Sequence, residues 1–267
     1  MTSFRYREFA PSAALAPLVR AMWRLTAEDC GPASERVEPI FPDGCVELVF
    51  HRADPFAARA PDGALVRQAS ALFVGPSTSA VHVARGATSD VIGIRFEPGA
   101  AAALGLPPLA ELRDRIVPLC DLGLRGLDAL RDAACDERPG NRFDRIEDAL
   151  LDRCTERAHG RRLADLVRAH ATIAAAASAS GRSTRQFERT FVRDVGFTPR
   201  ELKSVERFQR ALQLIDAGGR RLADVAQIAG YADEPHLCRD FRRFTGTTAT
   251  AYVTARSPLA AAFSTGG

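Results

Sequence analysis

Arginines recur at helical spacing in two segments of the C-terminal third of the chain. Residues 183–191 align with residues 233–241 at an offset of fifty positions. In each segment an apolar residue is followed by Arg two positions later and by Phe two positions after that. A guanidinium presents a planar fork of N–H donors that matches the edge of guanine and the oxygens of a phosphate. Arg189 and Arg239 therefore predict nucleic-acid recognition as the chemistry of these segments.

Helical periodicity places these arginines opposite an apolar face. Phe187, Phe191 and Val195 follow the i, i+4 spacing of a buried stripe, and Arg185 and Arg189 fall on the other side. The corresponding stripe of the second segment consists of Leu237, Phe241 and Phe244. Both segments are thus predicted to be amphipathic helices with basic outer faces.

Each predicted helix begins at a capping residue and follows a helix of small residues. Ser183 forms a capping-box pattern with Gln186, and Asp233 is the matching cap of the second copy. The upstream segments 173–179 and 222–229 are rich in alanine, which lets two helices cross closely. Each copy is thus predicted to be a helix-turn-helix, in which the second helix enters the DNA major groove. Two copies in one chain can bind two successive stretches of the groove. Ordinary amphipathic helices with solvated basic faces are the alternative, which the duplication disfavours.

Residues 161–255 resemble the DNA-binding domain of the AraC/XylS family of bacterial transcriptional regulators. The most specific stretch is 222–246, with an Ala-x-x-x-Gly-aromatic turn, an Arg before a Phe, and Phe-x-x-x-x-Gly. The resemblance implies helix-turn-helix motifs at about 161–196 and 220–247, joined by a linker helix over 202–217. It also implies a DNA-binding domain over 143–257 and a tail over 258–267. The sequence departs from the family in the alanine-rich first motif and in lacking a proline after Gly246.

The same resemblance assigns DNA contacts residue by residue. Base-edge contacts are expected from the starts of the two recognition helices, and phosphate contacts from arginines farther along. The base-edge set is Arg182, Arg185, Glu188 and Arg189 in the first copy, and Glu234, His236, Cys238 and Arg239 in the second. The remaining expected DNA-binding residues are Thr184, Arg193, Arg242 and Arg243.

The N-terminal half has a different pattern. Short alternating segments separated by Pro and Gly predict strands at 21–26, 45–51, 72–74, 80–85 and 91–96. Helical patterns follow at 100–104, 109–113 and 124–134. We therefore expect an α+β protein: a small antiparallel β-sheet or partial barrel with helices over residues 1–135, a linker at 136–142, and an all-α C-terminal domain.

This half resembles an N-terminal domain found in a subset of AraC-like regulators, through residues 39–50, 74–76 and 93–100 and through Trp23. A sensor or regulatory role is the expectation. Its candidate effector-pocket residues are Trp23, Asp43, Glu47 and Arg95. The alternative is structural: Asp43 makes a turn, Glu47 and Arg95 are solvated or paired with each other, and Trp23 is core.

Several function classes find no support in the sequence. His51 and His82 stand alone, so no metal site is expected, and no nucleotide-binding or hydrolase fingerprint indicates a cofactor or an enzyme. A DNA-repair or other enzyme fused to an AraC-like module would need a close cysteine cluster, which the scattered cysteines do not provide. An adaptor that has lost DNA binding is a further alternative, which the intact arginines disfavour. No apolar run is long enough to span a membrane, and we expect a cytoplasmic protein.

Charge is unevenly divided between the halves. Residues 143–267 hold 20 Arg and Lys against 15 Asp and Glu, whereas residues 1–142 hold 16 against 18. The basic excess thus lies with the predicted DNA-binding part. The expected partners are double-stranded DNA and a small-molecule effector, with a homodimer and a contact to RNA polymerase left open. The predicted helix that begins at Phe143 could pack on either domain or on a second subunit.

Overall fold

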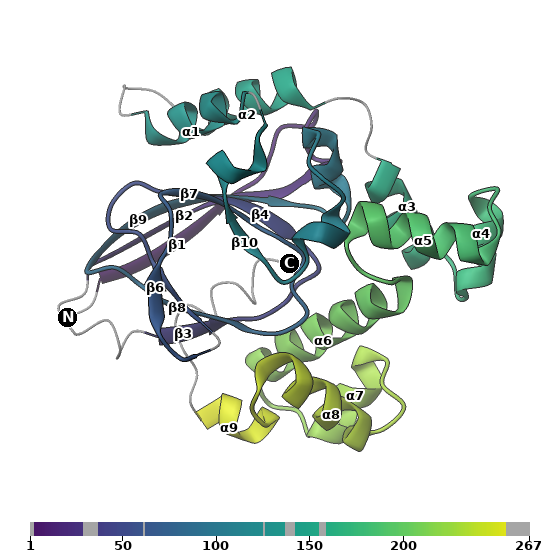
Figure 1. The fold of residues 1–267 in the computed structure, drawn as a ribbon. Coiled ribbons are helices and arrows are strands. Elements are labelled where there is room, and N and C mark those ends of the chain that lie inside the picture. Colours follow the sequence, from purple (N-terminus) through teal and green to yellow (C-terminus); the bar gives the residue numbers. More distant parts are fainter. Residues whose placement is uncertain are drawn as a thin grey trace.

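The computed structural model of the chain describes residues 3–28, 37–60, 62–124, 126–136, 142–154 and 159–254. Over these ranges an N-terminal half built on β-sheets adjoins a C-terminal half of helices (Figure 1). This arrangement confirms the predicted α+β fold class.

Antiparallel pairing organises the N-terminal strands into two sheets. The larger has the order β1-β2-β9-β4-β7-β10 and the smaller the order β3-β8-β5-β6. The larger sheet comprises β1 (Ser3–Phe9), β2 (Val19–Glu28), β9 (Thr88–Phe96), β4 (Val46–His51), β7 (Ala71–Val74) and β10 (Ile116–Pro118). The smaller comprises β3 (Val37–Ile40), β8 (Val81–Ala84), β5 (Ala57–Arg59) and β6 (Leu65–Arg67). All the predicted strands are present, as β2, β4, β7, β8 and β9, and the others come in addition.

Alternation along β4 divides its side chains between two environments. Leu48 and Phe50 are buried in an apolar cluster with residues of α1 (Leu127–Cys135) and α2 (Arg142–Arg153), which cover the outer face of the larger sheet. Val49 belongs to a separate cluster that includes Val83 of the smaller sheet. Successive side chains of a strand point to opposite faces, so Glu47, Val49 and His51 share the side that faces the smaller sheet.

Helix α2 packs with the N-terminal half. Its buried residues Phe143, Ile146 and Leu150 belong to the same apolar cluster as Leu48 of β4 and Leu130 of α1. The sequence predicts that the DNA-binding domain begins at residue 143. We propose that the boundary between the domains follows α2, because the apolar face of this helix completes the N-terminal core.

The sequence predicts helices at 100–104 and 109–113. The structure has short 3₁₀ helices there, Ala100–Leu104 and Leu109–Leu112. Pro107 and Pro108 stand between them, and Gly99, with φ 76°, precedes the first. Prolines lack the N–H that a continuous α-helix requires, so the chain makes two single turns there.

The C-terminal half consists of helices arranged around one long helix. They are α3 (His159–Ala169), α4 (Ile173–Ala179), α5 (Thr184–Val195), α6 (Pro199–Ala217), α7 (Leu222–Ala229), α8 (Glu234–Thr245) and α9 (Ala249–Thr254). Thr198 and Glu201 form a capping box at the start of α6, with Pro199 in the first turn. The linker helix predicted over 202–217 is thus present and begins three residues earlier, at Pro199. Helix α6 packs against both helix-turn-helix pairs, α4–α5 and α7–α8 (Figure 1). Its residue Phe208 is fully buried in the core that they share.

The two halves meet along an extensive interface. Arg113 forms a two-pronged ion pair with Glu201 of α6, at 2.6 and 3.0 Å. The backbone N–H of Ala80 donates to the carbonyl oxygen of Phe244 at 3.0 Å. Gly99 and Gly160 bring their backbones together so closely that a Cβ on Gly160 would lie 2.6 Å from the carbonyl oxygen of Gly99. The helices are therefore docked on the sheets through contacts that involve α3, α6 and α8.

Candidate nucleic-acid interface and inter-sheet cavity

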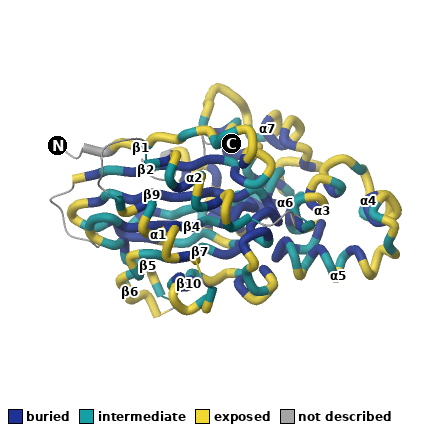
Figure 2. Tube along the Cα trace, turned by 90° about the horizontal axis from the view of Figure 1, so that it is seen from above, coloured by how far each residue is buried: buried dark blue, intermediate teal, exposed yellow. Residues whose placement is uncertain are grey.

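The outer face of α5 carries residues expected to contact DNA. Thr184, Arg185 and Arg189 are exposed and Glu188 is half-buried. On the opposite side Phe187 and Phe191 are fully buried, which fixes the rotation of the helix about its axis. The capping box of Ser183 and Gln186 provides hydrogen-bond acceptors for backbone N–H groups at the start of α5. Helices α4 and α5 project at one end of the molecule, with exposed residues along both (Figure 2).

Arg182, which is half-buried, and Arg193, which is exposed, form hydrogen bonds within the protein. An Nη of Arg182 donates to Nε2 of His159 at 3.0 Å, and Nδ1 of His159 lies 2.8 Å from Asp194. Arg193 donates from Nε to Asp194 at 2.6 Å. Although burial raises it, these hydrogen bonds from Arg193 and His159 lower the pKa of Asp194 on balance. This network holds the start of α3 to both ends of α5.

The second recognition helix, α8, presents Glu234, Arg239, Arg242 and Arg243 as exposed side chains. Cys238 and His236 are half-buried. The ring of His236 stands edge-on to Tyr231 with centroids 5.1 Å apart, and the guanidinium of Arg207 lies 5.3 Å from the centre of the same ring. His236 therefore packs at the turn between α7 and α8, and Glu234 and Arg239 are the more accessible of the base-reading residues predicted for this helix.

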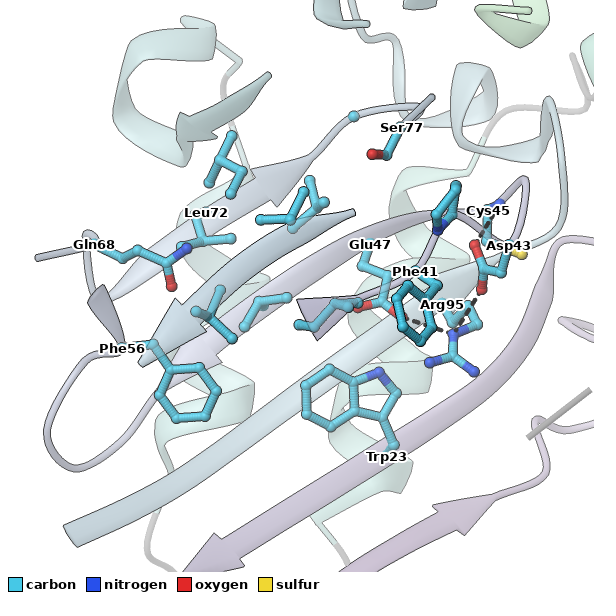
Figure 3. A pocket seen from close by; sticks show the side chains of 18 of the residues that line it. Trp23, Phe41, Asp43, Cys45, Glu47, Phe56, Gln68, Leu72, Ser77 and Arg95 are labelled. Carbon is cyan, nitrogen blue, oxygen red and sulfur yellow. Dashed lines mark hydrogen bonds and ion pairs between the residues drawn. The ribbon is translucent and has the colours of Figure 1, made fainter. Parts of the chain in front are cut away.

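A cavity of about 80 Å³ lies between the two sheets, several times the space that one water molecule needs. Trp23, Asp43, Glu47 and Arg95, the residues proposed from sequence for an effector pocket, all line it. Figure 3 shows Glu47, Arg95 and Asp43 grouped at one end, with Phe56 and Gln68 at the other. The structure thus brings the four predicted residues together, and their role in binding stays a prediction.

One buried guanidinium organises the polar end of the cavity. Arg95 is 2% exposed, and its Nε lies 2.7 Å from Glu47 and 3.4 Å from Asp43. An Nη of Arg95 lies 3.3 Å from Glu8 of β1. Three carboxylates therefore surround a single cation.

Burial shifts the ionisation of several groups that line the cavity. It raises the pKa of Glu47, and the charge of Asp43 adds to the rise against the opposing charge of Arg95. It also raises the pKa of Cys45, which keeps this thiol protonated. Burial lowers the pKa of His51 to about 4, so the imidazole is neutral at physiological pH.

Trp23 lies flat against the backbone of β9. A Cβ built on Gly93 would stand 2.0 Å from Cε2 of the indole, so only glycine leaves room for the ring. Tyr6 of β1 packs beside it with ring centroids 5.9 Å apart. The indole forms one wall of the cavity because the neighbouring strand has no side chain at that position.

Sequence reasoning missed other residues of the cavity. His51 occupies the same strand face as Glu47, and the alternation of β4 would have identified it. Phe41 and Gln68 come from segments between strands, for which periodicity gives no signal. Among the described residues, neither ring nitrogen of His51 has a hydrogen-bond partner of normal geometry. The nearby Gln68 side chain raises the pKa of His51, against the larger lowering caused by burial.

The segment between β3 and β4 connects the cavity with the long helix α6. Phe41 and Pro42 both line the cavity. Phe41 also belongs to the core of the C-terminal half, where its ring contacts that of Tyr252 at 5.7 Å between centroids. The Gln209 side chain of α6 donates to the carbonyl oxygen of Pro42 at 2.7 Å. The cavity wall and α6 are thus joined by a hydrogen bond and by packed aromatic rings.

Two further properties of the described residues bear on function. They contain no group of three or more His, Cys, Asp or Glu side chains placed to hold a metal ion. No helix among them is long and apolar enough to cross a membrane.

Two family models match the chain. Residues 7–118 match a domain of unknown function, DUF6597, and residues 176–255 match a helix-turn-helix domain. No curated protein matches it.

Among solved structures, the fold resembles ToxT from Vibrio cholerae, with 11% sequence identity and a TM-score of 0.47, over 94% of this chain and 98% of that one. A structure of ToxT with a bound unsaturated fatty acid gives 9% identity and a TM-score of 0.43, over 95% and 94%. A DNA-binding transcriptional dual regulator from Escherichia coli K-12 gives 29% identity and a TM-score of 0.30, over 36% of this chain and 88% of that one. The match over residues 176–255 includes α5 and α8, whose exposed arginines are described above. The chain joins a DUF6597 domain to an AraC-type helix-turn-helix domain, and it is a DNA-binding transcriptional regulator.

Proposed function

We propose that the protein reads two neighbouring major-groove segments with α5 and α8, and that a small molecule in the inter-sheet cavity changes this binding. The observation that carries the proposal is the position of α6. This helix holds both helix-turn-helix pairs, and it is bonded through Gln209 to Pro42 at the cavity wall. One molecule therefore contains two helix-turn-helix pairs, a cavity, and a helix, α6, that contacts both.

The DNA-binding role of individual residues follows from exposure and chemistry. Arg185, Arg189 and Arg239 are exposed on the two recognition helices, and arginine makes bidentate contacts with guanine. Glu188 and Glu234 can accept a hydrogen bond from the amino group of cytosine. Arg242 and Arg243, toward the end of α8, suit phosphate contacts that fix register.

The regulatory role follows from thermodynamic linkage. A ligand shifts an equilibrium only if it binds one conformational state better than another. A ligand in the cavity touches Phe41 and Pro42, and the same residues contact α6 and α9. Different placements of this segment would therefore change both cavity shape and the support of the second helix-turn-helix pair.

Such a regulator would act on chromosomal DNA in the bacterial cytoplasm. A homodimer and a contact with RNA polymerase belong to the same proposal. Both can be measured on the full chain, by sedimentation with and without DNA and by transcription with purified polymerase.

Selection of bound fragments from genomic DNA by the full chain tests the DNA-reading part. We expect enrichment of a shared sequence with two separated conserved blocks, and binding that weakens steeply as salt rises. Arg189→Ala and Arg239→Ala should each lower affinity for the selected site while Arg131→Ala, an exposed arginine on α1, does not. Enrichment of unrelated fragments with equal affinity would contradict sequence-specific reading.

A further inference from the structure

The cavity between the sheets has an uneven charge balance. Its lining includes the carboxylates of Asp43 and Glu47 and the guanidinium of Arg95, while His51 is neutral. With both carboxylates ionised, the lining carries one net negative charge. Glu8, which approaches Arg95 from β1 outside the lining, adds another carboxylate. The neighbouring Arg20 lies outside the lining and bonds Glu97 at 3.1 Å, a carboxylate that it shares with Arg161 and Arg168.

Hydrogen-bond capacity points in the same direction. A carboxylate has about four acceptor positions and a guanidinium five donors, so Asp43 and Glu47 together have about eight acceptor positions. One position on Asp43 accepts from the backbone N–H of Cys45 at 2.8 Å, which still leaves more acceptors than Arg95 has donors. Glu8 also takes one of the donors of Arg95. The polar end of the cavity therefore has acceptors in excess of donors, and a ligand that donates hydrogen bonds fits it.

The remaining walls suit an apolar body. The apolar side chains of Val49, Phe56 and Leu72 also line the cavity. The Trp23 indole forms the wall beside Glu47 (Figure 3). The face of an indole attracts cations, most strongly where water is excluded. At the far end, Gln68 and His51 can bond a neutral polar group.

We infer that the cavity binds a small amphipathic cation, an ammonium or guanidinium group on a short apolar body, with its charged end at Glu47, Asp43 and Trp23. This inference rests on the proposed role of the cavity as an effector site. A carboxylate ligand fits poorly, because it would compete with three protein carboxylates for Arg95 and would add to the negative charge. Asp43 and Glu47 share the single cation Arg95, and a buried charge that is incompletely balanced is costly, so a second cation is favoured there over an anion.

The chain contains one tryptophan, Trp23, so intrinsic fluorescence reports directly on the cavity. The probes are matched triplets with the same apolar body: n-butylammonium, butyrate and n-butanol, and benzylammonium, benzoate and benzyl alcohol, together with n-butylguanidinium. Each is titrated into the full chain while fluorescence and the melting temperature are recorded. We expect saturable binding of the cations at least about tenfold tighter than of the matching carboxylates.

Charge substitution supplies a sharper readout than loss of binding. Asp43→Asn with Glu47→Gln changes the charge of the lining from −1 to +1, so the preference should invert toward butyrate and benzoate. Glu8→Gln is the matched control, because it removes a carboxylate from the same guanidinium outside the cavity lining. Its selectivity should stay that of the wild type. Far-ultraviolet circular dichroism checks that each variant is folded.

The outcomes separate this inference from the proposed function. Binding of the carboxylates as tight as or tighter than that of the cations overturns the ligand class, as does a failure of all three cations to bind the wild type. If a carboxylate both binds and changes DNA affinity, the effector role stands and the ligand class is wrong. If cations bind selectively and DNA affinity for the selected site is unchanged, the ligand class stands and the coupling to DNA is wrong.

Discussion

Phe41 and Phe208 meet edge to face across the two halves of the protein, with ring centroids 6.2 Å apart and planes at 87°. Phe41 comes from the segment that lines the cavity, whereas Phe208 lies in the middle of α6 and is fully buried. Phe208 also contacts the rings of Phe241 and Phe244 in α8. One aromatic side chain of the N-terminal half is thus part of the core that positions the second recognition helix.

Replacing Phe41 by Ala should destabilise the protein and weaken DNA binding. Loss of a buried Phe side chain costs about 3–5 kcal/mol when the site cannot collapse. The unfolding free energy from urea denaturation measures this cost, and a fluorescence-anisotropy titration with the selected DNA measures affinity. Phe56→Ala is the control, because Phe56 also lines the cavity and belongs to the inter-sheet cluster and not to the C-terminal core. Equal effects of both variants on DNA affinity would contradict a special role for Phe41.

Arg189→Ala should reduce specific DNA affinity by about 1–3 kcal/mol, because it removes an exposed guanidinium from the outer face of α5. The comparison is between the selected site and the same site with one base pair changed at a time. If Arg189 contacts a base, the loss of affinity caused by Arg189→Ala should disappear when the contacted base pair is the one that is changed. A phosphate contact predicts a uniform loss and a smaller salt slope. Unchanged affinity in a folded variant would remove Arg189 from the interface.

Glu201 should make the stability of the protein depend on acid pH. Its pKa is lowered to about 2: burial alone would raise it, but hydrogen bonds from Arg113 and Thr198 outweigh that effect. A depressed folded-state pKa adds stability above the unfolded-state value near 4.5, and this contribution is lost as the pH falls toward 2. The unfolding free energy of Glu201→Gln should therefore be lower than that of the wild type at pH 7, and the difference should shrink below pH 4.5. A difference that is constant with pH would exclude the ion pair as its cause.

Gln at position 201 can still accept the hydrogen bond from the backbone of Thr198, which keeps the capping box of α6. Arg113→Gln leaves the whole cap in place and removes only the cation. The two variants should therefore lose similar stability at neutral pH. A much larger loss in Glu201→Gln would assign the contribution to the helix cap.

Local patterns predicted much of the helical half. Helices α4 and α7 have the bounds expected from their alanine-rich segments, and Ser183 caps α5 as its capping-box pattern indicates. These features depend on residues within a few positions of one another. The smaller sheet was only partly predicted, because β5 and β6 are three residues each and alternation is not visible over that length.

The cavity shows where sequence reasoning ends. Residue type alone predicts the candidate pocket residues Trp23, Asp43, Glu47 and Arg95. The pairing of β4 with β9 then brings Glu47 opposite Arg95. Phe41 enters the C-terminal core only because the two halves dock on each other. Local sequence patterns carry no information about that docking. The same holds for His51, whose neutral state follows from burial between sheets.

Gly93→Ala should displace the Trp23 indole. A Cβ at position 93 would lie 2.0 Å from Cε2 and 2.1 Å from Cζ2 of the ring, so either the ring or β9 must move. We expect a loss of stability of about 1–3 kcal/mol, as for other overpacked cores, and a shift of the emission maximum. Ser89→Ala, a buried position on the same strand away from the ring, is the control. An unchanged emission spectrum in Gly93→Ala would contradict the close packing of Trp23 on β9.

One protein molecule should protect two neighbouring major-groove segments on the same face of the DNA. Both helix-turn-helix pairs are fixed to α6: Arg168 of α3 bonds Glu206 at 2.7 Å, and the buried Ser204 hydroxyl bonds Asp240 of α8 at 2.8 Å. Two recognition helices held in this way should enter the groove about 34 Å apart, one turn of B-DNA. Hydroxyl-radical footprinting of the selected site should therefore show two protected segments. Arg239→Ala should weaken protection of one segment more than the other, and Arg189→Ala should give the reverse pattern. A single short protected segment, or equal weakening of both segments by each variant, would show that α5 and α8 do not read separate stretches of groove.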